Sequence, residues 1–159
     1  MSRIVQPGTR PQRIKALSDN LVGRGKLERL ASFLPTFSAN GFVFGSWTQL
    51  RSEEHGAMIL PSYMLEPAAL AFVETCYADG WINQNFDWVS WKETSEASAL
   101  RDDPTTLASA SASQIAQLLT VLVRQDRFSE GTLDWAFQTG LLSNILSRVS
   151  ELAGLSHPK

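Results

Sequence analysis

The sequence predicts a helix-dominated α+β fold, a compact domain of five to seven helices with one small β-hairpin on its flank. Most apolar residues recur at spacings of three and four, which is typical of amphipathic helices. One short stretch alternates instead and contains turn and edge residues of a hairpin. The chain has 159 residues, of which 43% are hydrophobic and 19% charged, a composition that suits one soluble globular domain.

The first elements follow helical spacing. An amphipathic helix is predicted over residues 12–22, and a second over about residues 26–39. Gly23 and Gly25 are expected to interrupt the first of these helices before the second begins. Pro35 lies inside the second pattern and is expected to kink that helix or end its first half.

The alternating stretch predicts a β-hairpin. Residues 42–47 alternate and favour a strand, and residues 51–56 form a polar segment that ends in glycine, as a hairpin loop does. Residues 57–63 are a second apolar run, whose end Pro61 places on a sheet edge. A lone hairpin is marginal in water, so this one is expected to pack on the helices or to gain further strands.

Helix-start residues mark the middle of the chain. Pro67 suits a first helical turn, and Gly80 ends the helix that it begins. Residues 81–82 are read as a third short strand. Asp87 suits an N-cap, and its helix is expected to continue to about Leu100.

The last third predicts helices joined by tight turns. A short helical turn is expected over residues 103–107, and Ser113 is predicted to cap the strongest helix of the chain, which ends near Arg127. The turn 129–131 leads into another helix, and Gly140 separates that helix from the last one.

Charge is distributed unevenly along the chain. Residues 1–26 hold six basic groups and one acid, whereas the other 133 residues hold eight basic groups and fifteen acids. We therefore predict a basic, flexible arm over residues 1–24 and one globular domain over residues 25–155. The arm is either a solvated terminus or a tether to nucleic acid or an acidic partner, although it lacks aromatic residues that could stack on bases.

Several classes of protein are disfavoured by what the sequence lacks. One cysteine and two histidines cannot build an internal disulfide or a typical zinc site. No apolar run approaches the ~18 residues of a membrane span, and no phosphate-binding glycine loop or hydrolase motif occurs. We expect a cytoplasmic protein without metal, cofactor or membrane contact, and the oligomeric state stays open.

The corner between two predicted helices is the main candidate site. Arg124 and Arg127 are three residues apart, so they are neighbours on a helix surface, and Glu130 and Thr132 lie where the next helix begins. Guanidinium groups and free N–H groups at a helix start bind phosphate or carboxylate. The pattern therefore predicts a binding or interaction protein with an anionic ligand, either nucleotide-like or an acidic peptide, provided that the arginine pair faces an open cavity.

The same residues support two other interpretations. Arginines in the last turn of a helix complement its negative end, and Asp126 or Glu130 could pair with them in a purely structural corner. In an enzyme, Glu130 or Asp126 would act as the base of a small hydrolase or transferase.

A DNA-binding helix-turn-helix is the weakest interpretation of this corner. The helix that follows it carries Asp134, Trp135 and Phe137, and it has no Lys or Arg. Nucleic-acid binding is therefore predicted only through the N-terminal arm.

Aromatic residues form the second candidate. Trp88 and Trp91, with Trp81 and Phe86 nearby in sequence, either belong to the core or form the wall of a ligand pocket beside the arginine corner.

Two motifs stand out, Phe86-Asp87-Trp88-x-x-Trp91 and Arg124-x-Asp126-Arg127-Phe128-x-Glu130-Gly131. Their order resembles a family of small uncharacterised bacterial proteins, the domain-of-unknown-function family 6508, over about residues 27–152. The resemblance implies a bacterial, cytoplasmic protein. It implies no activity and assigns no catalytic residue.

Overall fold

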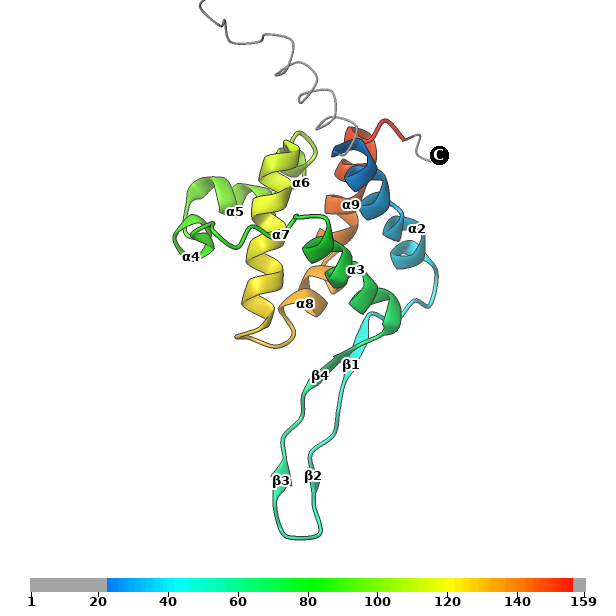
Figure 1. The fold of residues 1–159 in the computed structure, drawn as a ribbon, viewed down its shortest axis with the longest axis vertical. Helices are drawn as coiled ribbons and strands as arrows, with labels where there is room; N and C mark the ends of the chain where they lie inside the picture. The colour runs from blue at the N-terminus through cyan, green and yellow to red at the C-terminus, as the bar shows by residue number, and fades with distance from the viewer. Residues whose placement is uncertain (1–22, 156–159) are drawn as a thin grey trace, which may run out of the picture.

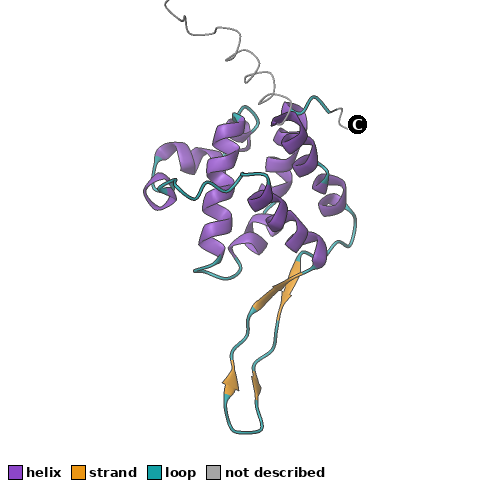
Figure 2. Ribbon diagram, in the orientation of Figure 1, coloured by secondary structure: helices purple, strands orange, loops and turns teal. Residues whose placement is uncertain are grey.

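A computed structural model describes residues 23–155, which form a helical body with a long two-stranded ribbon projecting from one end (Figures 1 and 2). The helix-dominated α+β class is confirmed. Within this part of the chain a helical stretch over residues 23–31 precedes eight helices, more than predicted because two predicted helices are each divided. The eight are α2 Phe33–Ser38, α3 Pro67–Ala78, α4 Trp88–Trp91, α5 Ser95–Asp102, α6 Pro104–Leu107, α7 Ala112–Asp126, α8 Thr132–Gln138 and α9 Leu141–Leu152.

The helix predicted over residues 26–39 is divided at Ser32. Pro35 is the third residue of α2, where a backbone N–H would have no partner within the helix, so the proline is tolerated there. Gly23 and Gly25 lie inside the preceding helical stretch and do not interrupt it, contrary to the prediction. The helix predicted over residues 12–22, and almost all of the predicted arm, lie outside the described residues.

The predicted hairpin is confirmed, and its strands span residues 45–65 rather than the predicted 42–63. It contains two short antiparallel ladders in one register, because Trp47 faces Tyr63 and Arg51 faces Ile59. The ladder breaks around Pro61, which has no N–H to donate. The strands are β1 Gly45–Trp47 paired with β4 Tyr63–Leu65, and β2 Arg51–Ser52 paired with β3 Met58–Ile59.

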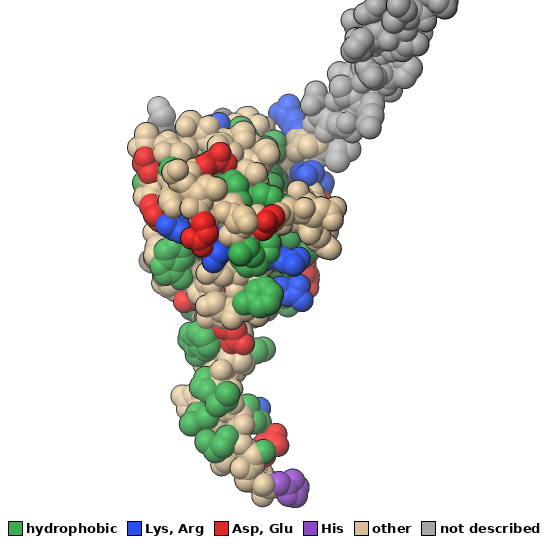
Figure 3. Space-filling view, turned by 90° about the vertical axis from the view of Figure 1, so that its left-hand side faces the viewer, with side chains coloured by type: hydrophobic (Ala, Val, Ile, Leu, Met, Phe, Trp, Pro, Cys, Tyr) green, Lys and Arg blue, Asp and Glu red, His purple; other side chains and the backbone are tan. Residues whose placement is uncertain are grey.

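One face of this ribbon is apolar and exposed. Leu50, Met58, Leu60 and Met64 share that face by the alternation of a strand, and each is more than half exposed. Figure 3 shows apolar side chains along much of the projecting ribbon. The hairpin packs on the helices as expected, but only through its base, where Phe44 and Tyr63 contact α8 and the turn before it.

The segment after α3 is buried but is not the predicted third strand. Trp81 and Ile82 are 3% and 5% exposed, and no strand pairs with them. The segment is held on α7 by Thr120, whose fully buried hydroxyl accepts the Asn83 N–H at 3.1 Å and donates to the Ala116 carbonyl at 2.8 Å.

The helix predicted from Asp87 to Leu100 is divided into α4 and α5. Asp87 caps α4 as predicted, since its side chain accepts the Ser90 N–H at 3.1 Å. Thr94 caps a second start by accepting the Ala97 N–H at 3.2 Å. This second cap ends α4 after one turn and lets α5 take a new direction.

Helix α7 is the longest helix in the described chain, and it buries seven residues. Its N-cap is Ser111 rather than the predicted Ser113, because only Ser111 has a glutamine three residues later and completes a capping box with Gln114. The helix ends at Asp126, close to the predicted end at Arg127. Gly131, the residue before α8, has φ 99°, a conformation that strongly favours glycine.

Aromatic packing fixes the root of the ribbon to the helices. Phe44 is 1% exposed and stacks on Phe137 of α8 with ring centroids 5.0 Å apart. Phe37 of α2 contacts both rings edge-on.

No helix within residues 23–155 is long and apolar enough to cross a membrane.

We predict that Thr120→Val lowers the free energy of unfolding by about 1–2 kcal/mol, because the Asn83 N–H and the Trp81 carbonyl lose the buried Thr120 hydroxyl while side-chain volume is kept. Urea denaturation measures this change. Thr139→Val is the matched control, because the Thr139 hydroxyl is exposed and bonds only within its own helix turn. Equal effects of the two substitutions would contradict the role given to Thr120.

Candidate functional site

The α7–α8 corner is held together by its carboxylates. Gly131, the residue before α8, has no side chain with which to cap the helix. Asp126 supplies the missing acceptor, since its Oδ1 accepts the Leu133 N–H at 3.0 Å across the turn. This carboxylate therefore has a structural partner at the start of α8.

Two further carboxylates of the corner bind the base of the ribbon through one residue. Glu130 Oε2 accepts the Tyr63 backbone N–H at 2.8 Å, and Asp134 Oδ1 accepts the Tyr63 hydroxyl at 2.6 Å. Burial, and then the hydrogen bond to Asp134, raise the pKa of the Tyr63 phenol well above its ordinary value. Tyr63 is thus clamped through its backbone to the turn before α8 and through its side chain to α8 itself.

The indole of Trp47 completes this clamp. Its ring meets Tyr63 edge-on at 5.4 Å, and its Cζ2 lies 3.1 Å from the position that a Cβ on Gly131 would occupy. Glycine is therefore required at residue 131 both by its positive φ and by this close contact.

The two arginines of the predicted site diverge. Arg127 is exposed and lies with Asp126 beside a separate recess of about 320 Å³, which Tyr77 of α3 also lines. Arg124 is half-buried, and its Nε is buried without a hydrogen-bond partner. Neither forms an ion pair with another described residue. The structure does not bring these arginines together around one opening.

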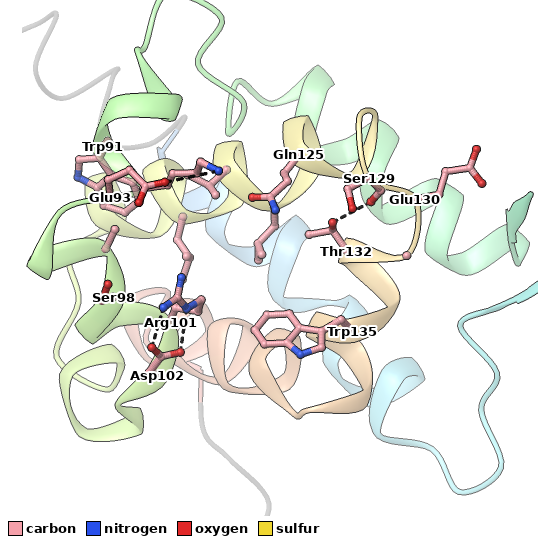
Figure 4. A pocket seen from close by; sticks show the side chains of 16 residues that line it. Trp91, Glu93, Ser98, Arg101, Asp102, Gln125, Ser129, Glu130, Thr132 and Trp135 are labelled. Atoms are coloured by element: carbon pink, nitrogen blue, oxygen red, sulfur yellow. Dashed lines mark hydrogen bonds and ion pairs between the residues drawn. The ribbon is translucent and has the colours of Figure 1, made fainter.

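A larger cavity, of about 730 Å³, opens on the other side of the corner (Figure 4). Helices α4 and α5 form one wall, and α7 with the start of α8 forms the other. Leu118 and Leu122 of α7 contribute apolar surface. Three predicted site residues lie on this cavity, namely Glu130, Thr132 and Trp91. Arg124, Arg127, Asp126 and Trp88 are not among the residues that line it.

Two residues that the sequence analysis did not single out dominate the cavity. Arg101 of α5 holds Asp102 with two hydrogen bonds of 2.8 and 2.7 Å, and Arg101 and Trp135 of α8 both line the cavity (Figure 4). Trp135 is 45% exposed. The Thr94 cap is the signal that would have found this arrangement, because it divides the predicted helix and turns α5 toward α8.

The charges on the cavity nearly balance. Lys92 and Arg101 face three carboxylates, and Lys92 Nζ lies 3.7 Å from Glu93. The pair of Arg101 with Asp102 is exposed, whereas in the pair of Lys92 with Glu93 the lysine is half-buried and the glutamate is exposed. Glu130 supplies the third carboxylate. Exposed pairs of this kind are weak, so a ligand can compete for either cation.

The predicted tryptophans occupy different places. Trp91 lies in the cavity wall, where its Nε1 donates to Glu96 at 3.1 Å and its ring meets Phe86 at 5.7 Å. Trp88 instead stacks near Phe128, with ring centroids 6.3 Å apart, at the outer side of the corner. Phe128 is 78% exposed, so this second pair leaves apolar surface open to solvent.

No three His, Cys, Asp or Glu side chains lie close enough to hold a metal ion within residues 23–155. Cys76 is fully buried on α3, and burial raises the pKa of its thiol. A buried thiol with a raised pKa is a poor nucleophile.

With this geometry established, the chain can be placed among known proteins. It belongs to the family of unknown function DUF6508, which matches residues 23–154, and the family resemblance is confirmed. No curated protein and no solved structure matches the chain significantly. The function of this family is unknown, so the site has to be interpreted from its own chemistry.

We predict that Tyr63→Phe lowers the free energy of unfolding by about 1.5 kcal/mol at neutral pH, because Asp134 loses a charge-assisted hydrogen bond. Folding raises the pKa of Tyr63, so the folded state holds the phenol proton more tightly than the unfolded state. The stabilisation is therefore complete at neutral pH and declines as the pH rises above about 10, the ordinary pKa of tyrosine.

Urea denaturation at pH 7 and at pH 10.5–11.5 measures both effects. Tyr77→Phe is the control, because Tyr77 has no side-chain hydrogen bond to another described residue. The alkaline loss of stability should be smaller in Tyr63→Phe than in the natural chain. An unchanged alkaline slope would show that the phenol of Tyr63 does not hold the ribbon.

Proposed function

We propose that this member of the family is a binding protein whose ligand occupies the cavity between α4–α5 and α7–α8. The ligand is a small molecule with a planar ring and at most one negative charge. The observation that carries the proposal is the Trp135 indole, which lies nearly half exposed in the wall of a cavity of about 730 Å³. Pockets of about 300–1,000 Å³ with an aromatic wall are typical of small-ligand sites.

Polar groups around the indole support a ligand of this kind. The Gln125 amide points into the cavity (Figure 4), and neither Gln125 nor Ser98 makes a side-chain hydrogen bond to another described residue. The Thr132 hydroxyl donates to the Ser129 carbonyl at 2.8 Å and keeps its acceptor capacity. The edge of a heteroaromatic ring that stacks on Trp135 would find donors and acceptors here.

The balance of charge defines the ligand further. Two cations and three carboxylates line the cavity. A single anionic group can displace Glu93 from Lys92 or share the free N–H groups of Arg101. A polyphosphate or an acidic peptide would also meet Glu93, Asp102 and Glu130. The sequence analysis predicted an anionic ligand at Arg124 and Arg127. We propose instead that the ligand carries at most one negative charge and that Lys92 and Arg101 bind it.

The alternative of a hydrolase or transferase gains no support from the geometry. Asp126 accepts the Leu133 N–H, and Glu130 accepts the Tyr63 N–H, so both candidate bases have backbone partners. Nucleic-acid binding through the arm would depend on residues outside the described chain. Binding in the cavity is therefore the function that we propose.

The proposal is tested with a library of planar heteroaromatic fragments and the ¹⁵N-labelled chain, read by the indole N–H signals. We include adenosine, cyclic AMP and ATP, which share one ring system and differ in charge. We expect neutral and singly charged members to move the Trp135 signal and ATP to bind more weakly than cyclic AMP. Trp135→Ala should weaken binding about tenfold, since stacking contributes about 1–3 kcal/mol.

Trp88→Ala is the matched control, because Trp88 lies outside the cavity. The proposal fails if no fragment moves the Trp135 signal, if the polyanion binds best, or if Trp88→Ala and Trp135→Ala weaken binding equally.

A further inference from the structure

One face of the projecting ribbon carries no charged side chain. The two ladders share one register, so the residues of this uncharged face form four facing pairs. From the base of the ribbon to its tip, the pairs are Ser46 with Met64, Thr48 with Ser62, Leu50 with Leu60, and Ser52 with Met58. The charged residues of the ribbon lie elsewhere, since Arg51 is on the other face and the acids are in the tip loop 53–57.

The large apolar side chains of the uncharged face lie mostly in solvent. Leu50, Met58, Leu60 and Met64 are 55–71% exposed. Apolar side chains line much of the projecting ribbon in Figure 3. A two-stranded hairpin is marginally stable alone in water, and contiguous exposed apolar surface is typical of an interaction site. We therefore expect a partner to cover this face.

The small polar residues of the face can be buried at little cost. Thr48 Oγ1 accepts the Ser62 N–H at 2.8 Å and lies 3.5 Å from the Ser62 hydroxyl. The Thr48 N–H donates to the Ser62 carbonyl at 2.8 Å. Because these groups have partners within the ribbon, an apolar surface that covers them leaves none of these bonds broken.

The order of large and small side chains makes the centre of the face complementary to itself. A two-fold axis can lie in the interface, perpendicular to the strands, between the Thr48–Ser62 pair and the Leu50–Leu60 pair. It places a second ribbon antiparallel on the first. Leu50 then lies on Thr48 of the second copy, and Leu60 lies on Ser62 of the second copy. Large side chains thus meet small ones, as packed sheets about 10 Å apart require.

The ends of the two faces match in the same arrangement. Met58 near the tip of one ribbon meets Met64 near the base of the other, and Ser46 meets Ser52. Each contact occurs twice, once in each direction, as two-fold symmetry requires. A face that supplies both the large side chains and the small ones that receive them fits a second copy of itself.

The size and charge of the face agree with this partner. Covering the eight residues in two copies removes roughly 1,000 Å² from solvent, which is near the lower limit of specific interfaces and fits a weak dimer. No ion has to lose its water, because the face has no charge. A nucleic acid or an acidic segment would find no cation on this face.

We propose that two copies of this chain form a dimer in which the uncharged faces of their ribbons pack on one another, antiparallel about a two-fold axis. The dimer does not depend on the ligand proposed for the cavity beside Trp135.

Sedimentation equilibrium of the full chain across the micromolar range tests the dimer. We expect a monomer–dimer equilibrium. Leu60→Glu places a charge at the centre of the face and should raise the dissociation constant at least tenfold, and the fold should be kept because Leu60 is exposed. Gln49→Glu is the matched control and should leave the constant unchanged, since Gln49 is exposed and lies on the opposite face beside Leu50.

Disulfide formation tests the arrangement of the two ribbons. Met58 and Met64 lie about 20 Å apart along one strand, too far to be bridged within a chain. An oxidised mixture of the Met58→Cys chain and the Met64→Cys chain should give a covalent dimer in much higher yield than either variant alone. The natural Cys76 is buried and does not compete.

Four results would overturn the proposal. They are a chain that stays monomeric throughout the micromolar range, a dimer that Leu60→Glu and Gln49→Glu weaken equally, and a mixture of cysteine variants that cross-links no better than each variant alone. The fourth is a monomer that binds phosphatidylcholine vesicles and loses this binding in Leu60→Glu, which would assign the face to lipid.

Discussion

The fold depends on one set of hydrogen bonds, which the carboxylates of the α7–α8 corner accept. Asp126 caps α8, while Glu130 and Asp134 hold the backbone and the hydroxyl of Tyr63. Without these bonds no side-chain hydrogen bond among residues 23–155 would join the ribbon to the helices, and α8, which follows a glycine, would have no side-chain cap. Asp126, Glu130 and Gly131 of the most distinctive sequence motif thus have structural roles. The corner that they stabilise also forms part of the wall of the main cavity.

Local signals predicted much of this architecture. Pro67, Asp87 and the turn 129–131 each begin an element where the sequence analysis placed one, because a cap or a positive φ depends only on neighbouring residues. The break at Thr94 was missed, since a continuous apolar pattern concealed the second cap. Non-local contacts were beyond reach: nothing near Tyr63 in sequence indicates that Glu130 and Asp134 bind it.

The candidate site, like the fold, was predicted from the sequence only in part. Glu130, Thr132 and Trp91 lie on the main cavity, whereas Arg124 and Arg127 do not, because helical spacing places two residues near one another without showing what they face. Arg101 and Trp135 line the same cavity only because α5 and α8 both pack on α7. Two of the basic residues near the N-terminus, Arg24 and Lys26, line a separate pocket of about 560 Å³.

Amide hydrogen exchange tests the central claim most directly, because the Tyr63 N–H is bonded to the Glu130 carboxylate rather than to a neighbouring strand. In the natural chain this amide should exchange much more slowly than the amides of the ribbon tip around Glu54, and Glu130→Ala should abolish that difference. A Tyr63 amide that exchanges as fast as the tip in the natural chain would contradict the account of the corner and of the cavity that it supports.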